Sequence, residues 1–88
     1  MKILYGRGFC KITFEGDEKN SGKTLFVRGE QGDSDEFFVY KSLLDKMSWS
    51  FTKDGETCCS WVDNNEKDEI LAYVIEEAKK EGCSLVLW

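Results

Sequence analysis

NEKDEILAYVIEEAKKEG, residues 65–82, is the stretch of sequence that decides the fold. Its apolar side chains recur at helical spacing, with charged side chains largely on the other side, and the apolar stripe consists of Ile70, Leu71, Val74, Ile75 and Ala78. A polar residue at 63–65 can cap the start, Lys79 and Lys80 suit the negative end of the helix dipole, and Gly82 suits the stop. The pattern predicts an amphipathic helix with one buried face.

The rest of the chain has the two-residue period of β-strands. Near the N-terminus, Cys10, Ile12 and Phe14 alternate with polar residues, which indicates a strand with one buried face. The predicted strands are residues 3–14, 23–29, 37–40, 47–52 and 84–88. Residues 16–22 are predicted to form a turn, and residues 54–65 a loop. A turn or a single helical turn is expected at 43–46. The apolar run at 37–40 fits a central strand covered on both faces, or one whose second face meets a partner.

Strands first and a helix late predict an α+β domain: a mostly antiparallel sheet of four to five strands with one C-terminal helix packed on one face. The 88 residues fit one domain, residues 1–88. If the first four strands form a meander, successive connections alternate between the two ends of the sheet. The segments 30–36 and 54–65 are then expected at the same end, with the N-terminus of the helix beside them.

The formal charge of −5 is concentrated in two segments. Residues 30–36 contain four acids and no base, and residues 54–69 contain six acids and one base. At one end of a sheet, these segments would form an acidic pole that steers a basic partner and repels nucleic acid. A solvated acidic surface without a partner is the alternative. A cation site at Asp33, Asp35 and Glu36 is a third reading, although the segment lacks the pattern of a calcium loop.

The chain lacks the residues that several kinds of catalysis require. The chain has no His, which removes the usual general base, the usual metal ligand and the Ser-His or Cys-His pair. Cys58 and Cys59 are adjacent, so the spacing of zinc ligands and of a thioredoxin-like motif is missing. Residues 21–24, SGKT, resemble only the tail of a phosphate-binding loop. We therefore expect no enzyme, no cofactor and no metal. A thiol enzyme or redox sensor built on Cys58 and Cys59 stays as an alternative.

The N-terminal residues MKILYGRGF are too polar for a secretory signal, and no apolar run approaches the length of a membrane span. These features predict a cytoplasmic protein. Four cysteines, Cys10, Cys58, Cys59 and Cys83, are then expected to be free and mostly buried thiols.

Candidate partner-binding residues follow from charge and aromatic placement. The carboxylates are Glu30, Asp33, Asp35 and Glu36, which would steer a partner, and Trp61 is the candidate anchor because it lies in the second acidic segment. Tyr40 is a further candidate, since a Tyr ring can be buried while its hydroxyl stays wet. Core packing is the alternative role for Tyr40 and for Trp88, and Trp49 is expected in the core.

A family resemblance rests on short motifs spread from about residue 8 to residue 86. They are GE at 29–30, FVY at 38–40, SL at 42–43, a Trp at 49, DGE at 54–56 and EK..I at 66–70. In this order they resemble small immunity proteins of bacterial polymorphic toxin systems, which are encoded beside a toxin and neutralise it. The resemblance implies a cytoplasmic inhibitor that binds its toxin without catalysis.

Residue chemistry and resemblance together lead to one functional hypothesis. The protein is expected to be a non-catalytic protein-binding module, an immunity protein that neutralises a cognate bacterial toxin through an acidic surface. Its partner would be a protein, such as a basic toxin domain, and neither nucleic acid nor a membrane is expected. The alternative is a small structural or self-associating domain with no toxin partner, for which Phe38, Tyr40 and Trp88 are the candidate contacts.

Overall fold

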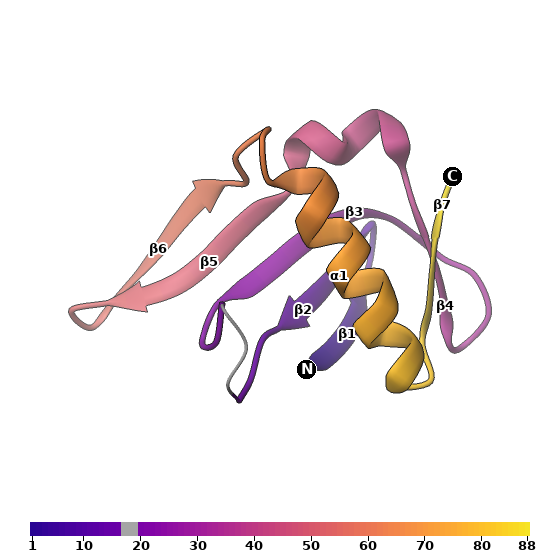
Figure 1. Ribbon diagram of the computed structural model, residues 1–88, viewed down its shortest axis with the longest axis horizontal. Helices are drawn as coiled ribbons and strands as arrows, with labels where there is room; N and C mark the ends of the chain where they lie inside the picture. Colours follow the sequence, from indigo (N-terminus) through magenta and orange to yellow (C-terminus); the bar gives the residue numbers. More distant parts are fainter. Residues whose placement is uncertain (17–19) are drawn as a thin grey trace.

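The computed structural model describes residues 1–16 and 20–88, which form a twisted sheet crossed on one face by an α-helix (Figure 1). The strands are β1 Lys2–Gly6, β2 Phe9–Thr13, β3 Thr24–Gln31, β4 Glu36–Val39, β5 Ser48–Lys53, β6 Glu56–Trp61 and β7 Ser84–Leu87. The helices are the 3-10 helix η1, Lys41–Lys46, and α1, Lys67–Lys80. The α+β class with a mostly antiparallel sheet is confirmed, but the described residues form seven strands rather than four to five. The predicted turn at 16–22 includes residues 17–19, which lie outside the described residues.

The first of the two additional strands arises from a hairpin near the N-terminus. Residues 3–14 were expected to form one strand, but β1 pairs antiparallel with β2, with Tyr5 opposite Cys10 and Gly6 opposite Phe9. The chain reverses at Arg7 and Gly8, and Gly8 has a φ of 82°, a value that L side chains rarely adopt. The hairpin also corrects the expected orientation of Leu4. In one continuous strand Leu4 would share the buried face of Cys10, Ile12 and Phe14, yet its side chain is 49% exposed.

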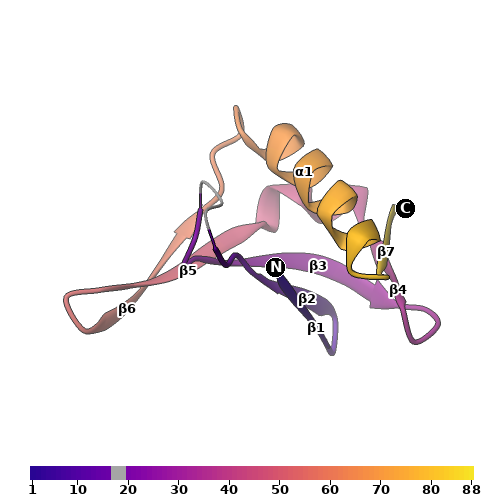
Figure 2. The same ribbon diagram turned by 60° about the horizontal axis from the view of Figure 1, so that its bottom comes forward.

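The second additional strand is β6, in a segment that was expected to be a loop. It pairs along its length with β5, and Lys53 and Glu56 flank the two-residue turn that joins the strands. Five of its six residues are exposed, with Cys58 as the exception, so β6 has no alternation of buried and exposed positions. An amphipathic pattern could not reveal this strand, because the hairpin projects from the body of the molecule (Figures 1 and 2).

The architecture depends on β3, whose edge opposite β2 is shared by two strands. The first part of β3, residues 24–26, pairs with β5, and the last part, residues 29–31, pairs with β4. Both strands are antiparallel to β3, so β4 and β5 run in the same direction, one after the other, with η1 between them. We call this divergence of β4 and β5 from β3 the fork. On its outer side β4 pairs in parallel with β7.

The fork overturns the expected acidic pole. Because the chain does not reverse between β4 and β5, the turn after β5 lies at the opposite end of the long axis from the turn after β3 (Figure 1). The N-terminus of α1 was also expected beside residues 30–36. Instead the segment after the C-terminus of α1 meets this turn, where the backbone N–H of Ser84 donates to the carbonyl of Asp35 at 2.7 Å. The two acidic segments therefore do not form one pole.

The core lies between α1 and the sheet. The buried apolar residues are Cys10, Ile12, Phe14, Leu25, Val27, Phe37, Val39, Met47, Trp49, Val62, Leu71, Val74, Ala78 and Leu85. The helix supplies Leu71, Val74 and Ala78, which belong to the predicted apolar stripe, and Trp49 is in the core as expected. Full burial of a large apolar side chain contributes about 1.5–3 kcal/mol, so this layer is the main source of stability.

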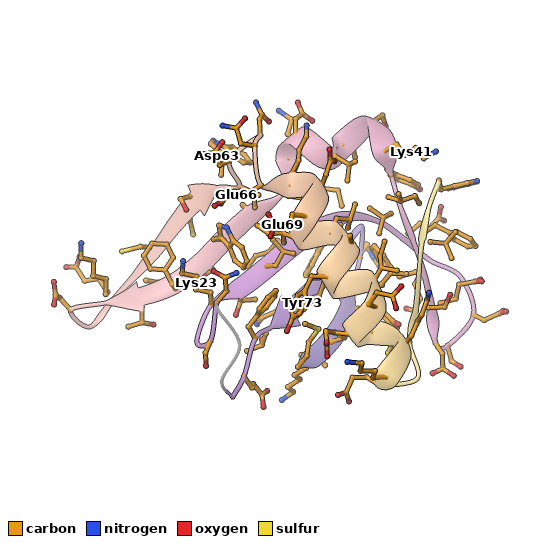
Figure 3. The ribbon with its side chains drawn as sticks, viewed as in Figure 1. Lys23, Lys41, Asp63, Glu66, Glu69 and Tyr73 are labelled. Atoms are coloured by element: carbon orange, nitrogen blue, oxygen red, sulfur yellow. The ribbon has the colours of Figure 1, made fainter. Side chains whose placement is uncertain are left out.

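The ends of α1 agree with the sequence only in part. The predicted stop is confirmed, because the backbone N–H of Gly82 donates to the carbonyl of Lys79 at 3.1 Å and Gly82 has a φ of 80°. At the start, however, the N-cap is Glu66, and its side chain forms no capping hydrogen bond. The carboxylate of Asp63 accepts a hydrogen bond from the backbone of Asn65 instead. Figure 3 shows Glu66 at the start of α1, Glu69 on its first turn and Tyr73 further along the helix.

Candidate functional site

A broad depression with a volume of about 1260 Å³ lies at the fork of the sheet. Arg28 and Glu30 line it and alternate along β3 with the buried Leu25 and Val27, so it opens on the face away from α1. Figure 2 shows α1 on one side of the sheet and this other side without it. We call the depression the fork groove. Its lining includes Arg7, Arg28, Glu30, Tyr40, Lys46 and Trp61.

Glu30 and Tyr40 form a hydrogen-bonded pair in the fork groove. Glu30 lies on β3, and Tyr40 follows β4 directly, so the pairing of these strands brings the two side chains together. The Tyr40 hydroxyl donates to a Glu30 carboxylate oxygen at 2.8 Å. This hydrogen bond, with a smaller effect of burial, raises the pKa of Tyr40 above its ordinary value. The sequence singled out both residues, and the structure joins them.

Trp61 ends β6 at the other side of the groove. Its side chain is 68% exposed, which is unusual for an indole and distinguishes it from Trp49 in the core. The ammonium of Lys46, on η1, lies 5.9 Å from the centroid of the Trp61 ring, in cation–π range. Trp61 therefore offers an apolar surface held beside a positive charge.

The other three predicted carboxylates lie outside the fork groove. Asp33, Asp35 and Glu36 belong to the turn between β3 and β4 and to the start of β4. Backbone hydrogen bonds order this turn, from the N–H of Glu36 to the carbonyl of Asp33 and from the N–H of Gly32 to the carbonyl of Glu36. Within the described residues, none of the three carboxylates forms an ion pair. We call residues 33–36 the acidic turn. The six predicted site residues thus separate into a groove set and a turn set.

Three cations in the fork groove were not predicted as site residues. Arg7 comes from the turn between β1 and β2, Arg28 from β3 and Lys46 from η1. Among the described residues, the one acid in the groove lining is Glu30. The lining therefore carries a formal charge of +2, whereas the whole chain carries −5. Only the position of Arg28 had a signal in the sequence, because it alternates with buried residues on β3. The convergence of the other two depends on the fork.

A cluster of aromatic rings lies at the C-terminal end of the chain, just after β7. The ring of Trp88 packs against Phe38 at 5.3 Å and Tyr40 at 5.7 Å between centroids. The Trp88 side chain nevertheless stays 66% exposed, whereas Phe38 and Tyr40 are partly buried. Core packing, the alternative considered for Tyr40 and Trp88, therefore does not describe Trp88.

All four cysteines are free thiols, and their environments differ. Cys10 is buried, and burial followed by the neighbouring Cys83 raises the pKa of its thiol to about 12. Cys59 is exposed, whereas Cys58 and Cys83 are intermediate, so the expectation of mostly buried thiols is wrong. Cys58 and Cys59 are successive residues of β6 and point to opposite faces of the sheet. Their adjacency in sequence does not create a dithiol site.

Among residues 1–16 and 20–88, no group of three or more Cys, Asp or Glu side chains is arranged to hold a metal ion. In the same part of the chain, no helix has the length and apolar character needed to cross a membrane. Comparison of the chain with protein-family models, with curated proteins and with solved structures gives no match. The geometry of the fork groove is therefore the basis for a functional proposal.

Proposed function

We propose that this protein is a non-catalytic protein-binding module that holds its partner in the fork groove. The observation that carries the proposal is the convergence of Glu30, Tyr40 and Trp61. These residues were selected from the sequence for separate reasons, and all three line one depression. An open groove with an exposed indole and an ordered Tyr–carboxylate pair suits the anchor residues of a protein interface.

Following the resemblance to immunity proteins, we propose that the partner is a bacterial toxin encoded beside this protein and neutralised by it. The acidic turn would have a supporting role in this complex. Its carboxylates form no ion pair within the described residues, so they are available to steer a basic region of the toxin during association. Anchoring would remain with the groove, because exposed charge pairs each contribute at most about 1 kcal/mol.

The experiment combines the purified protein with the product of the neighbouring gene and measures binding and relief of toxicity. Trp61→Ala should weaken binding by tenfold or more, since a central indole is worth about 2 kcal/mol or more at an interface. Trp88→Ala removes an indole of similar exposure that is not part of the groove lining but packs on Tyr40, so it should weaken binding less than Trp61→Ala does. Neutralising Asp33, Asp35 and Glu36 should mainly slow association at low salt. A complex that tolerates both Trp61→Ala and the neutralised acidic turn would exclude the proposed surface.

Self-association is a second candidate function, favoured by the outer strands of the sheet. In the described residues, β6 pairs only with β5, and its sequence contains neither Lys nor Pro, which commonly protect an edge. On β7, Val86 and Leu87 are 38% and 40% exposed. Sedimentation over a range of concentrations tests this function. A dimer would support it, and a monomer at high concentration would count against it.

A further inference from the structure

The charge of the fork groove differs in sign from the charge of the whole chain. Arg7, Arg28 and Lys46 reach the groove from three separate segments of the chain. Glu30 is the one described residue of the groove lining with a negative charge. The Glu30 carboxylate already accepts the hydrogen bond of Tyr40. A segment entering the groove therefore meets an excess of positive charge.

The two arginines are free to bind an anionic group. Both side chains belong to exposed residues, and within the described part of the chain neither forms an ion pair. A guanidinium presents a planar set of donors that matches a carboxylate with two parallel hydrogen bonds. Because Arg7 and Arg28 are on different elements that line one groove, they can hold two carboxylates of one extended segment.

The neighbouring surfaces favour a short acidic segment over a nucleic acid. The acidic turn begins two residues after Gln31, which lines the groove, and it carries three acids. The affinity of a protein for nucleic acid grows with the number of phosphates that its cations neutralise. A long polyanion would have only three groove cations to bind, and beyond them it would meet this negative charge. A segment of a few residues stays within the groove, and its apolar side chains can pack on the exposed ring of Trp61.

We propose that the fork groove binds an extended acidic segment of a protein partner, with carboxylates on Arg7 and Arg28 and an apolar side chain on Trp61. This inference rests on the proposed function and adds the chemistry of the bound segment. It also separates two contacts: the groove receives acidic residues, and the acidic turn faces basic ones.

The test titrates the complete protein, labelled with ¹⁵N, with a capped hexapeptide that repeats aspartate, glutamate and leucine. A hexapeptide that repeats asparagine, glutamine and leucine is the uncharged control, and an eight-nucleotide oligothymidine is the nucleic-acid probe. We expect only the acidic peptide to shift the indole signal of Trp61 and the backbone signals of Arg28 and Tyr40. Equal shifts with the uncharged peptide, stronger binding of oligothymidine, or no binding of the acidic peptide would each overturn the inference.

Two double variants show whether the groove cations carry the binding. Arg7→Gln with Arg28→Gln should weaken binding of the acidic peptide by about tenfold, from two exposed charge pairs of up to about 1 kcal/mol each. Lys79→Gln with Lys80→Gln changes the net charge equally, but on α1, where both lysines pair with glutamates. An equal loss in this control would mean that only the total charge matters, and would overturn the inference. If the peptide fails while Trp61→Ala still abolishes neutralisation of the toxin, the proposed function stands without this inference.

Discussion

Gly29 provides a direct test of the fork, because it lies where β3 passes from one partner strand to the other. It is buried, it pairs with Val39, and its backbone N–H donates to the carbonyl of Gly8 at 3.2 Å. A Cβ at this position would clash with the backbone carbonyl of Phe38 and would lie 2.7 Å from the ring of Phe37. The carbonyl belongs to a paired strand and has little freedom to move. Gly29→Ala is therefore expected to disrupt the pairing of β3 with β4.

The expected cost is at the upper end of the range for overpacking, about 3 kcal/mol. With a urea dependence of about 1 kcal/mol per M for a chain of this size, the midpoint of unfolding should fall by about 3 M. Two other glycines are controls. A Cβ at Gly8 meets nothing within 4 Å, so only its φ of 82° opposes Gly8→Ala, at about 1 kcal/mol. At Gly6 the added Cβ meets the partly buried ring of Phe9, which can move aside on the open face.

The measurement is urea unfolding followed by tryptophan fluorescence, for the three variants side by side. We expect Gly29→Ala to be the most destabilised variant, by about 2 kcal/mol or more. A Gly29→Ala protein within about 1 kcal/mol of the wild type would refute it, because the carbonyl of Phe38 could not then lie against Gly29 as described. Similar losses in all three variants would equally refute a special constraint at the fork.

Three further predictions concern single side chains. The Tyr5 hydroxyl is buried without a hydrogen-bond partner that meets the usual geometry, and the Tyr5 ring stacks on Phe37 with 5.7 Å between centroids. Tyr5→Phe should therefore raise the free energy of unfolding by about 1 kcal/mol. A lower free energy of unfolding in the variant would show that the hydroxyl has a hydrogen-bond partner. Burial raises the pKa of Cys10 from 9.0 to about 12, so the folded state keeps a proton that the unfolded state loses. Stability from this group is thus complete below pH 9.0 and should fall by about 1.4 kcal/mol per unit up to about pH 12. In urea unfolding at each pH, the loss should therefore be steeper in the wild type than in Cys10→Ala, which keeps only the slope from groups such as Tyr5, whose pKa burial also raises. Glu30→Gln should lower the pKa of Tyr40 in an ultraviolet titration, because the carboxylate that stabilises the protonated phenol is gone; an unchanged titration would contradict the Glu30–Tyr40 pair.

The helix and the core strands could be predicted because their patterns are local. The stripe that includes Leu71 and Val74 fixes the buried face of α1, and the alternation around Leu25 fixes that of β3. The first hairpin also has a local signal, because two glycines flank Arg7 at its turn, but the prediction of one strand over residues 3–14 omits this turn. With that turn overlooked, the residues before it were assigned to the wrong face.

The fork groove could not be predicted, because it depends on non-local strand pairing. After Tyr40 the chain could have reversed beside β4, as in a meander, or continued along the free part of β3. The second arrangement places Lys46 and Trp61 in one groove with Arg28, and nothing in the sequence around these residues indicates it. Glu30, Tyr40 and Trp61 follow from charge and aromatic placement along the chain, so the sequence identifies some contacts without locating the site.

Separated charges give association at the fork groove an unusual dependence on salt. The described residues extend 38 Å along the longest axis, whereas electrostatic interactions are screened over about 30 Å at 0.01 M salt and about 8 Å at 0.15 M. At about 0.01 M an acidic peptide therefore meets the net negative charge of the whole protein, and at about 0.15 M mainly the cations of the groove. Its association rate constant should first rise with salt and then fall, as the groove attraction is screened in turn. Stopped-flow fluorescence of Trp61 in a Trp49→Phe and Trp88→Phe background measures this rate constant. A rate constant that only falls with salt would show that the net charge does not oppose approach, and one that only rises would show that the groove cations do not attract the segment.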